Sequence, residues 1–186
     1  MTVLVLAGWA RFPGVPHAPD PEPATARQVL PAAAVRDADP AATPPELRTV
    51  AGDTVFVDSR DTAALERFCA EHRIPVRRRP DIWGDLLEPF LDTRFDDRHH
   101  TATLDRLERG GVGRDEAVRI RRRVGPLMTA YNSLHWDWHH LGLADLLEAA
   151  ASDHVPAELR VPPQDRAAFR AWAMEIADRP VRAATA

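Results

Sequence analysis

Residues 54–78 read TVFVDSRDTAALERFCAEHRIPVRR, and this stretch decides the fold. Its first part, Thr54–Ser59, is an apolar run that predicts a strand covered on both faces. Ser59 or Asp61 can cap the helix predicted to follow, and Ile74–Arg78 then returns to an extended pattern. A strand, a helix and a strand in so few residues predict a βαβ crossover with parallel strands.

A second apolar run, Thr2–Gly8, predicts another strand, and both strands are expected to be central in the sheet. The segment between them, Arg11–Arg48, contains more than half of the chain's 17 prolines and many alanines. Proline restricts the backbone and cannot donate a ladder hydrogen bond. Residues 11–48 are therefore expected to form a long, largely irregular loop.

From Asp81 onward, the apolar residues recur at helical spacing. Asp85, Glu88 and Asp92 lie opposite the apolar face of the first predicted helix, where solvated side chains belong. A kink or restart is expected at Gly125–Pro126. Further helices are predicted over residues 96–109, 113–123, 127–151 and 164–178.

These patterns predict an α+β or small α/β fold. A short, parallel, βαβ-containing sheet in the N-terminal half is expected to pack against a predominantly helical C-terminal half. The expected subdomains are residues 1–80, which include the loop 11–48, and residues 81–186. Because the linker between them is short, one compact unit is expected.

The composition, with 45% hydrophobic and 28% charged residues among 186, is that of a soluble globular chain. All 24 basic residues are arginine, which indicates a GC-rich bacterial genome and excludes lysine-dependent chemistry. The net charge of -4 makes nucleic acid an unexpected partner. The arginine clusters 77–79 and 119–123 are interpreted chiefly as solvated faces, with phosphate binding as the alternative. No glycine-rich nicotinamide motif or P-loop occurs.

Cys69 is the only cysteine, so the chain can form no internal disulfide and fits a reducing cytoplasm. Its place in an amphipathic stretch predicts a buried structural thiol. The apolar run Val3–Ala10 is too short to span a membrane and lacks the positive residues of a secretory signal. We therefore expect a cytoplasmic protein with no membrane partner.

The segment around Asn132, His135 and His139 contains the most informative polar side chains. On one continuous helix these three residues lie on the same arc, between two apolar faces. They are the predicted catalytic residues of a His/Asn-lined cleft, because buried histidine transfers protons near neutral pH. The alternative is that both histidines are hydrogen-bonded core or interface residues.

Two histidines one turn apart can also bind a metal ion. His135 and His139 are the predicted core of such a site, with Asp92, His99 or His100 as a further ligand. Imidazole and carboxylate ligands favour zinc, iron or manganese. Metalloprotease chemistry has no support, because the His-x-x-x-His spacing lacks the glutamate of the zincin motif.

Asp58, Ser59 and Asp61 follow a predicted strand, at the sheet edge where open α/β folds bind ligands. They are candidate ligand-binding residues, although helix capping explains the same pattern. Arg11 is a further candidate, as a cation for an anionic substrate.

Two functions fit these observations. The first is an enzyme-like protein that binds a small anionic molecule in its cleft, with a divalent metal as an optional cofactor. The alternative is a non-catalytic interaction or regulatory protein, which binds a protein partner or forms a homodimer through the aromatic-rich helix.

Overall fold

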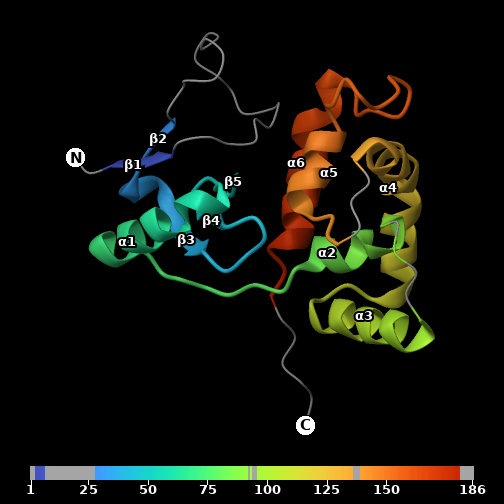
Figure 1. The fold of residues 1–186 in the computed structure, drawn as a ribbon, viewed down its shortest axis with the longest axis horizontal. Coiled ribbons are helices and arrows are strands. Elements are labelled where there is room, and N and C mark those ends of the chain that lie inside the picture. The colour runs from blue at the N-terminus through green and yellow to red at the C-terminus, as the bar shows by residue number, and fades with distance from the viewer. Residues whose placement is uncertain (1–2, 7–27, 92, 94–95, 136–138, 181–186) are drawn as a thin grey trace. The chain divides into compact units, whose positions relative to one another are not determined.

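The computed structural model describes residues 3–6, 28–91, 93, 96–135 and 139–180. It divides the chain into two compact units, of which the N-terminal unit ends at Arg79 and the C-terminal unit continues from Pro80. The strands lie in the first unit and most of the helices in the second (Figure 1). The fold is therefore mixed α+β, as predicted. The packing of both units into one body stays a prediction.

The sheet of the N-terminal unit is antiparallel and has three strands in the order β3 (Val35–Asp39), β4 (Glu46–Thr49) and β5 (Thr54–Phe56). Leu47 of β4 pairs with Ala38 of β3 and Val55 of β5, so these residues share one face. A separate ladder pairs β1 (Val3–Leu6) with β2 (Gln28–Pro31), and the short 3₁₀ turn η1 (Ala32–Ala34) leads into β3.

One face of this sheet is covered by α1 (Thr62–His72), which follows the 3₁₀ turn η2 (Ser59–Asp61). The helix buries Leu65, Phe68 and Cys69, as its spacing predicts. These side chains belong to one apolar cluster with residues from the strands and from the segment after α1: Val35, Ala38, Leu47, Val57 and Ile74. Burial raises the pKa of the Cys69 thiol, which fits a structural role.

The β3 and β4 side chains that alternate with those of the apolar cluster are charged and buried. Asp37 and Asp39 are 3% and 2% exposed, and Glu46 and Arg48 are 7% and 2% exposed. Arg79 joins this group, because its Nη1 lies 3.2 Å from Glu46 Oε1 and its Nη2 forms an ion pair with Asp37. Its backbone N–H also donates to Asp39 Oδ2 at 2.8 Å. Buried charges are tolerated when they are paired in this way.

The prediction of a parallel sheet is wrong, because β3, β4 and β5 pair antiparallel and β5 lies at an edge of their sheet. The chain leaves α1 and returns beside β3, where Val76 and Ala38 form a single parallel bridge. Ala38 N–H donates to the Pro75 carbonyl at 3.0 Å, and Arg77 N–H donates to the Ala38 carbonyl at 2.8 Å. β3 and β4 thus separate the two ends of the predicted crossover.

The irregular loop predicted over residues 11–48 is also wrong in its second half, since β2, β3 and β4 lie within it. Asp37 and Asp39 of β3 and Glu46 and Arg48 of β4 are charged but buried and bonded inside the unit, which hides the apolar pattern of a strand. β1 was expected to be central but pairs with β2 in a two-stranded ladder. Residues 7–27, which include Arg11, lie outside the described residues.

The C-terminal unit is helical. Its elements are α2 (Ile82–Leu87), η3 (Glu88–Phe90), α3 (Asp97–Arg109), α4 (Arg114–His135), α5 (Leu143–Ala149), η4 (Pro163–Asp165) and α6 (Arg166–Ala177). Asp96 caps α3 by accepting a hydrogen bond from the backbone N–H of His99 at 2.8 Å. α3 ends at Arg109 with Gly110 as its C-cap, and Gly111 then takes φ +83°, which favours glycine. The predicted helix 96–109 is confirmed.

The helix predicted over residues 127–151 is wrong. α4 runs through Gly125–Pro126 without a break and ends at His135, while α5 begins anew at Leu143. The new start has its own cap, because Gly142 N–H donates to Asp145 Oδ2 at 2.7 Å. Gly125 leaves room for Phe90, whose Cε1 would lie 3.2 Å from a Cβ there.

Trp83 anchors the core of the C-terminal unit. It is 1% exposed, and its Nε1 donates to the Ala173 carbonyl of α6 at 2.9 Å. Its ring meets that of Trp172 edge-on, with 5.6 Å between centroids. These contacts fix α2 against α6, so the first turn of α2 has a defined position.

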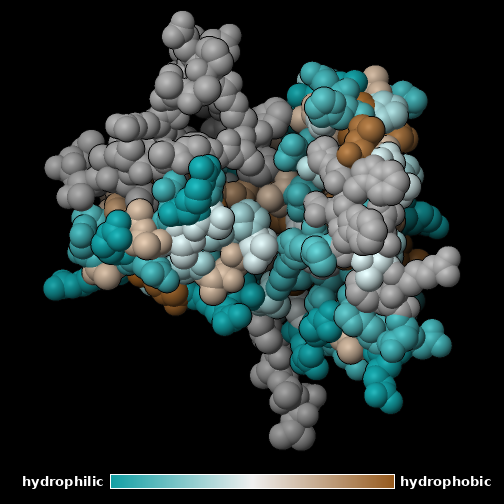
Figure 2. Space-filling model, in the orientation of Figure 1, coloured by the Kyte–Doolittle hydropathy of each residue, from teal (hydrophilic) through white to brown (hydrophobic). Residues whose placement is uncertain are grey.

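On the face drawn in Figure 2, hydrophilic side chains cover most of the described surface and hydrophobic ones form small patches. The large hydrophobic residues that are exposed lie at separate places in the chain: Val50, Val76, Val118 and Leu134. Scattered residues of this kind are ordinary on a protein surface. None of the described helices has both the length and the apolar character of a membrane span.

Candidate functional site

A cavity of about 340 Å³ opens in the C-terminal unit, beside α2 and α3. Its lining comes from the start of α2 and the end of α3: Pro80, Asp81, Asp85, Arg106, Arg109 and Gly110. These residues line the hollow mostly with apolar atoms, and the ion pair of Asp85 and Arg106 belongs to the same set. The volume of the hollow is at the lower end of the range of ligand pockets.

Asp85 and Arg106 form the central ion pair of the cavity. Arg106 Nη2 and Nε lie 2.7 Å and 2.9 Å from the same oxygen, Asp85 Oδ1. Burial raises the pKa of Asp85 and outweighs the hydrogen bond from Arg106, which lowers it. The same hydrogen bond raises the pKa of Arg106, so the guanidinium stays charged.

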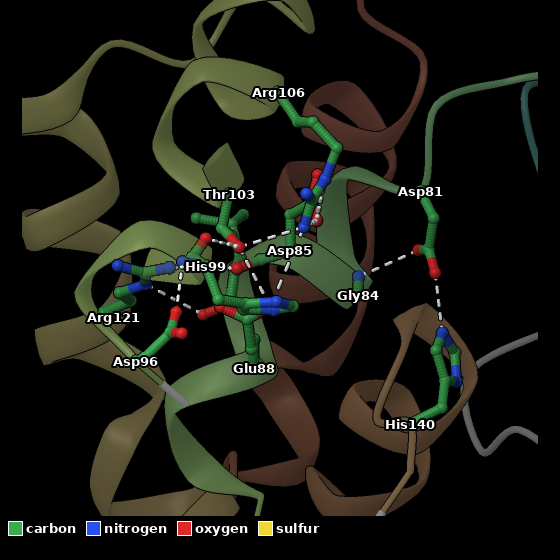
Figure 3. A network of polar contacts seen from close by, with 11 residues as sticks. Asp81, Gly84, Asp85, Glu88, Asp96, His99, Thr103, Arg106, Arg121 and His140 are labelled. Atoms are coloured by element: carbon green, nitrogen blue, oxygen red, sulfur yellow. Dashed lines mark hydrogen bonds and ion pairs between the residues drawn. The ribbon is translucent and has the colours of Figure 1, made fainter. Parts of the chain in front are cut away.

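A chain of hydrogen bonds leads from this ion pair to a buried glutamate (Figure 3). Arg106 Nη2 donates to Thr103 Oγ1 at 2.9 Å, and Thr103 Oγ1 donates to Glu88 Oε1 at 2.9 Å. His99 Nε2 lies 2.7 Å from the same glutamate oxygen. Glu88 is 8% exposed, which corrects its predicted solvated position. α3 packs on the face of α2 and η3 that the helical pattern assigned to solvent.

Asp81 makes a separate set of contacts at the start of α2. Its Oδ1 accepts from the backbone N–H of Gly84 at 2.8 Å and so caps α2. Its Oδ2 lies 2.6 Å from His140 Nε2, which follows the end of α4 (Figure 3). Both oxygens of Asp81 are therefore engaged within the unit.

Arg121 of α4 binds the backbone of α2. Its Nε and Nη2 donate to the carbonyls of Leu86 and Asp85, at 3.0 Å and 2.9 Å. Burial lowers the pKa of this guanidinium. The backbone of α2 is thus held from α4 while its side chains meet α3.

Several polar atoms of the cavity residues remain available to a ligand. Within the described part of the chain, Asp85 Oδ2 accepts no hydrogen bond and Arg106 Nη1 donates none. Arg109 is exposed and forms no ion pair with any described residue. Among the residues that line the cavity, one oxygen of Asp85, one nitrogen of Arg106 and the Arg109 guanidinium are thus not bound by any described residue.

The predicted catalytic residues lie elsewhere. Asn132 is 2% exposed and its Nδ2 donates to the Phe90 carbonyl at 3.0 Å. His135 is the last residue of α4, and its side chain is outside what the structure describes. His139 is exposed beyond the helix end. The three residues do not share one continuous helix, because α4 ends at His135.

The predicted metal ligands are only partly described. His99 is engaged with Glu88, whereas Asp92 and the His135 side chain lie outside the described residues. Among the side chains that are described, no group of three or more His, Cys, Asp or Glu residues could hold a metal ion. A metal at His135 and His139 stays a prediction.

Asp58, Ser59 and Asp61 lie just before α1. Asp58 accepts from the backbone N–H of Arg60 at 2.8 Å, and its Oδ2 lies 2.7 Å from Arg60 Nη2. These hydrogen bonds lower the pKa of Asp58 to about 2. Ser59 and Asp61 lie in the 3₁₀ turn η2, where the Ser59 carbonyl accepts from Thr62 Oγ1 at 2.8 Å. Capping is therefore confirmed for Asp58, which caps η2, whereas the Asp61 side chain makes no capping hydrogen bond to α1.

The arginine clusters are divided between internal and exposed side chains. Arg79 and Arg121 bind groups of their own unit, and the Arg123 guanidinium carbon lies 3.9 Å from the centroid of Trp172. Arg119 and Arg122 are exposed, as predicted for a solvated face.

Arg106 and Thr103 are not among the site residues predicted from the sequence. A signal was present, because Asp85 and Glu88 on one helix, and Thr103 and Arg106 on the next, are both spaced three residues apart. Complementary polar pairs on consecutive helices indicate that the two helices meet along those faces.

Comparison of the chain with protein-family models, with curated proteins and with solved structures finds no match. The function must therefore be argued from the geometry of the site.

Proposed function

We propose that this protein binds a small polar molecule in the cavity beside the Asp85–Arg106 ion pair. The observation that carries the proposal is a cavity of about 340 Å³ beside an ion pair in which no described residue binds Asp85 Oδ2 or Arg106 Nη1. Small-molecule sites commonly combine such a hollow with a few polar groups that fix the ligand's orientation. The site replaces the predicted His/Asn-lined cleft.

The arrangement of Arg106 supports this function. Its Nε and Nη2 are held by Asp85 and Thr103, so the guanidinium has a fixed orientation before a ligand arrives. A side chain that is already ordered loses little conformational entropy on binding. Arg121 adds rigidity by fixing the backbone carbonyl of Asp85.

Screening a library of small polar molecules by thermal shift, followed by calorimetry, tests the proposal. We expect binders whose affinity falls at least tenfold in Arg106→Gln, which removes charge-assisted hydrogen bonds. Arg122→Gln is the matched control, because Arg122 is an exposed arginine outside the cavity. Binders that are equally affected by both substitutions, or no binders at all, would reject the cavity as the site.

A second candidate function is acid–base catalysis by His99. The supporting observation is the 2.7 Å contact between His99 Nε2 and the buried carboxylate of Glu88. A carboxylate that orients an imidazole is a recurrent part of catalytic sites. If a bound molecule is turned over, His99→Gln should abolish turnover and leave its dissociation constant unchanged. Unchanged turnover in that variant would exclude the catalytic role.

A further inference from the structure

We infer that an acidic, extended peptide of a partner protein docks on the outer edge of segment 75–79 and adds a strand to the sheet of the N-terminal unit. Segment 75–79 lies beside β3, to which it is joined by the parallel bridge between Val76 and Ala38. Its other side is called the docking edge below. This surface is additional to the proposed cavity and does not depend on it.

The inner side of segment 75–79 is bound by β3. The Pro75 carbonyl accepts from Ala38 N–H at 3.0 Å, and Arg77 N–H donates to the Ala38 carbonyl at 2.8 Å. Arg79 N–H donates to the Asp39 carboxylate at 2.8 Å. Residues 75, 77 and 79 therefore direct these backbone groups toward β3.

The docking edge consists of the backbone groups of Val76 and Arg78. Successive residues of an extended chain direct their N–H and C=O groups to opposite sides, so those of Val76 and Arg78 point away from β3. No described residue forms a hydrogen bond with either residue's backbone. Donors and acceptors in such an open row are a template on which another strand can pair.

The side chains along the docking edge are accessible. Val76 is 62% exposed, and Arg77 and Arg78 are exposed as well. Within the described part of the chain, neither arginine forms an ion pair. Neighbouring side chains of an extended segment lie on opposite faces, so the two arginines lie on opposite faces of the edge. An incoming strand would therefore have a guanidinium beside each of its faces.

These charges favour an acidic peptide over a second copy of the chain. A carboxylate opposite Arg77 or Arg78 would form a charge-assisted cross-strand pair. Pairing of two such edges would instead bring arginines of both copies together, and like charges in opposite positions destabilise a sheet. The apolar part of the peptide would cover Val76.

The backbone groups favour a peptide over a nucleic acid. Phosphate groups can accept hydrogen bonds from Arg77 and Arg78, but they donate none to the carbonyls of Val76 and Arg78. An extended peptide supplies N–H and C=O groups in the alternation that the docking edge requires. A peptide with carboxylates thus matches the donors, the acceptors and the cations of the edge together.

Fluorescence anisotropy with labelled peptides of about nine residues tests the docking edge. The probe repeats the unit Val-Glu-Glu, which places carboxylates on both faces of a strand. In one control lysine replaces each glutamate, and in the other proline replaces each valine. The proline control keeps the charge but cannot form a continuous ladder. We expect the probe to bind at least tenfold more tightly than either control.

Substitutions of Val76 test the backbone pairing. Val76→Pro removes the outward N–H and leaves the groups that bind Ala38, so it should weaken probe binding at least tenfold. Val76→Thr keeps this N–H and should bind the probe as the wild type does. Slower hydrogen exchange of the Val76 and Arg78 amides in the bound wild type is a second measure, which holds even if Val76→Pro lowers thermal stability.

Reversal of charge tests the role of the arginines. Replacing Arg77 and Arg78 together by Glu should make the lysine peptide the tighter ligand. The same double replacement at Arg119 and Arg122, which are also exposed, is the matched control and should leave the preference for the probe unchanged. Equal effects of the two double replacements would contradict docking at segment 75–79.

Three further outcomes would overturn the inference. Equally tight binding of the proline control would mean that only general charge attraction acts. Tighter binding of an oligothymidylate of the same net charge would assign the arginines to nucleic acid. Absence of binding at millimolar peptide concentration would mean that Arg77 and Arg78 only protect the edge from pairing. None of these outcomes bears on the cavity, which belongs to the other unit.

Discussion

Arg179 and Glu116 form an ion pair with two parallel contacts, in which Arg179 Nη1 lies 2.9 Å from Glu116 Oε2 and Nη2 lies 2.8 Å from Oε1. Arg179 Nη1 also donates to the Gly111 carbonyl at 3.0 Å. The hydrogen bond to Glu116 raises the pKa of Arg179. Arg179, which follows α6, is thereby bound to the turn after α3 through Gly111 and to the first turn of α4 through Glu116.

Replacing Arg179 by Lys should lower the free energy of unfolding by about 1 kcal/mol, because a lysine ammonium cannot reproduce the paired geometry. Denaturant unfolding followed by Trp fluorescence measures the change. The exposed Arg122→Lys substitution is the control and should be neutral. Equal effects of the two substitutions would show that the ion pair adds nothing to stability.

Asp85→Asn should change the pH dependence of stability. Burial raises the pKa of Asp85 above its ordinary value of 3.8, so between these two pKa values the folded protein binds more protons than the unfolded chain. The contribution of this carboxyl to stability is therefore present below pH 3.8 and lost as the pH rises through the folded pKa. Unfolding curves from pH 3 upward, at about 0.5-unit steps, should show this loss in the wild type and not in Asp85→Asn. Parallel curves would contradict the prediction.

Asn132→Ala should lower the free energy of unfolding by about 1 kcal/mol, because the partly buried Phe90 carbonyl loses the hydrogen bond from the buried Asn132 side chain. If Asn132 is a core residue, the affinity of a cavity ligand should not change. Ser133→Ala, at an exposed neighbouring position, is the control. A selective loss of binding with normal stability would restore Asn132 as a ligand-binding residue.

Trp83→Phe should cost about 2 kcal/mol of stability, because it removes buried volume and leaves the Ala173 carbonyl without its indole donor. Trp172→Phe should cost less, since Trp172 is only partly buried. Thermal unfolding followed by circular dichroism compares the two variants. A larger loss of stability in Trp172→Phe would mean that Trp172 contributes more to the core than Trp83.

The helices that could be predicted from the sequence are those whose apolar spacing agrees with their final burial. α3 begins one residue after its predicted start and ends at the predicted Arg109, because Asp96 and Gly110 are local signals. The strands β3 and β4 could not be found in this way. Their charged residues are satisfied by partners such as Arg79, which lies 33 residues beyond Glu46 in the chain.

The candidate site escaped prediction for a related reason. Glu88 is on the side of its helix that looks solvated, and its burial arises only because α3 folds back and supplies Thr103 and His99. Conversely, the predicted arc of Asn132, His135 and His139 assumed that α4 continues. Helical periodicity identifies a face, but the element that covers the face depends on where each helix ends.

The parallel bridge at Val76 and the contacts of Arg79 determine where the N-terminal unit can be cut. A fragment that stops at the end of α1 would retain the acidic side chains of Asp37 and Glu46 and lose the guanidinium that pairs with both. It would also leave the backbone N–H and carbonyl of Ala38 without their partners in the 75–77 segment. Fragments for expression or for domain fusion should therefore keep the chain through Arg79, because the last residues of the unit complete its sheet.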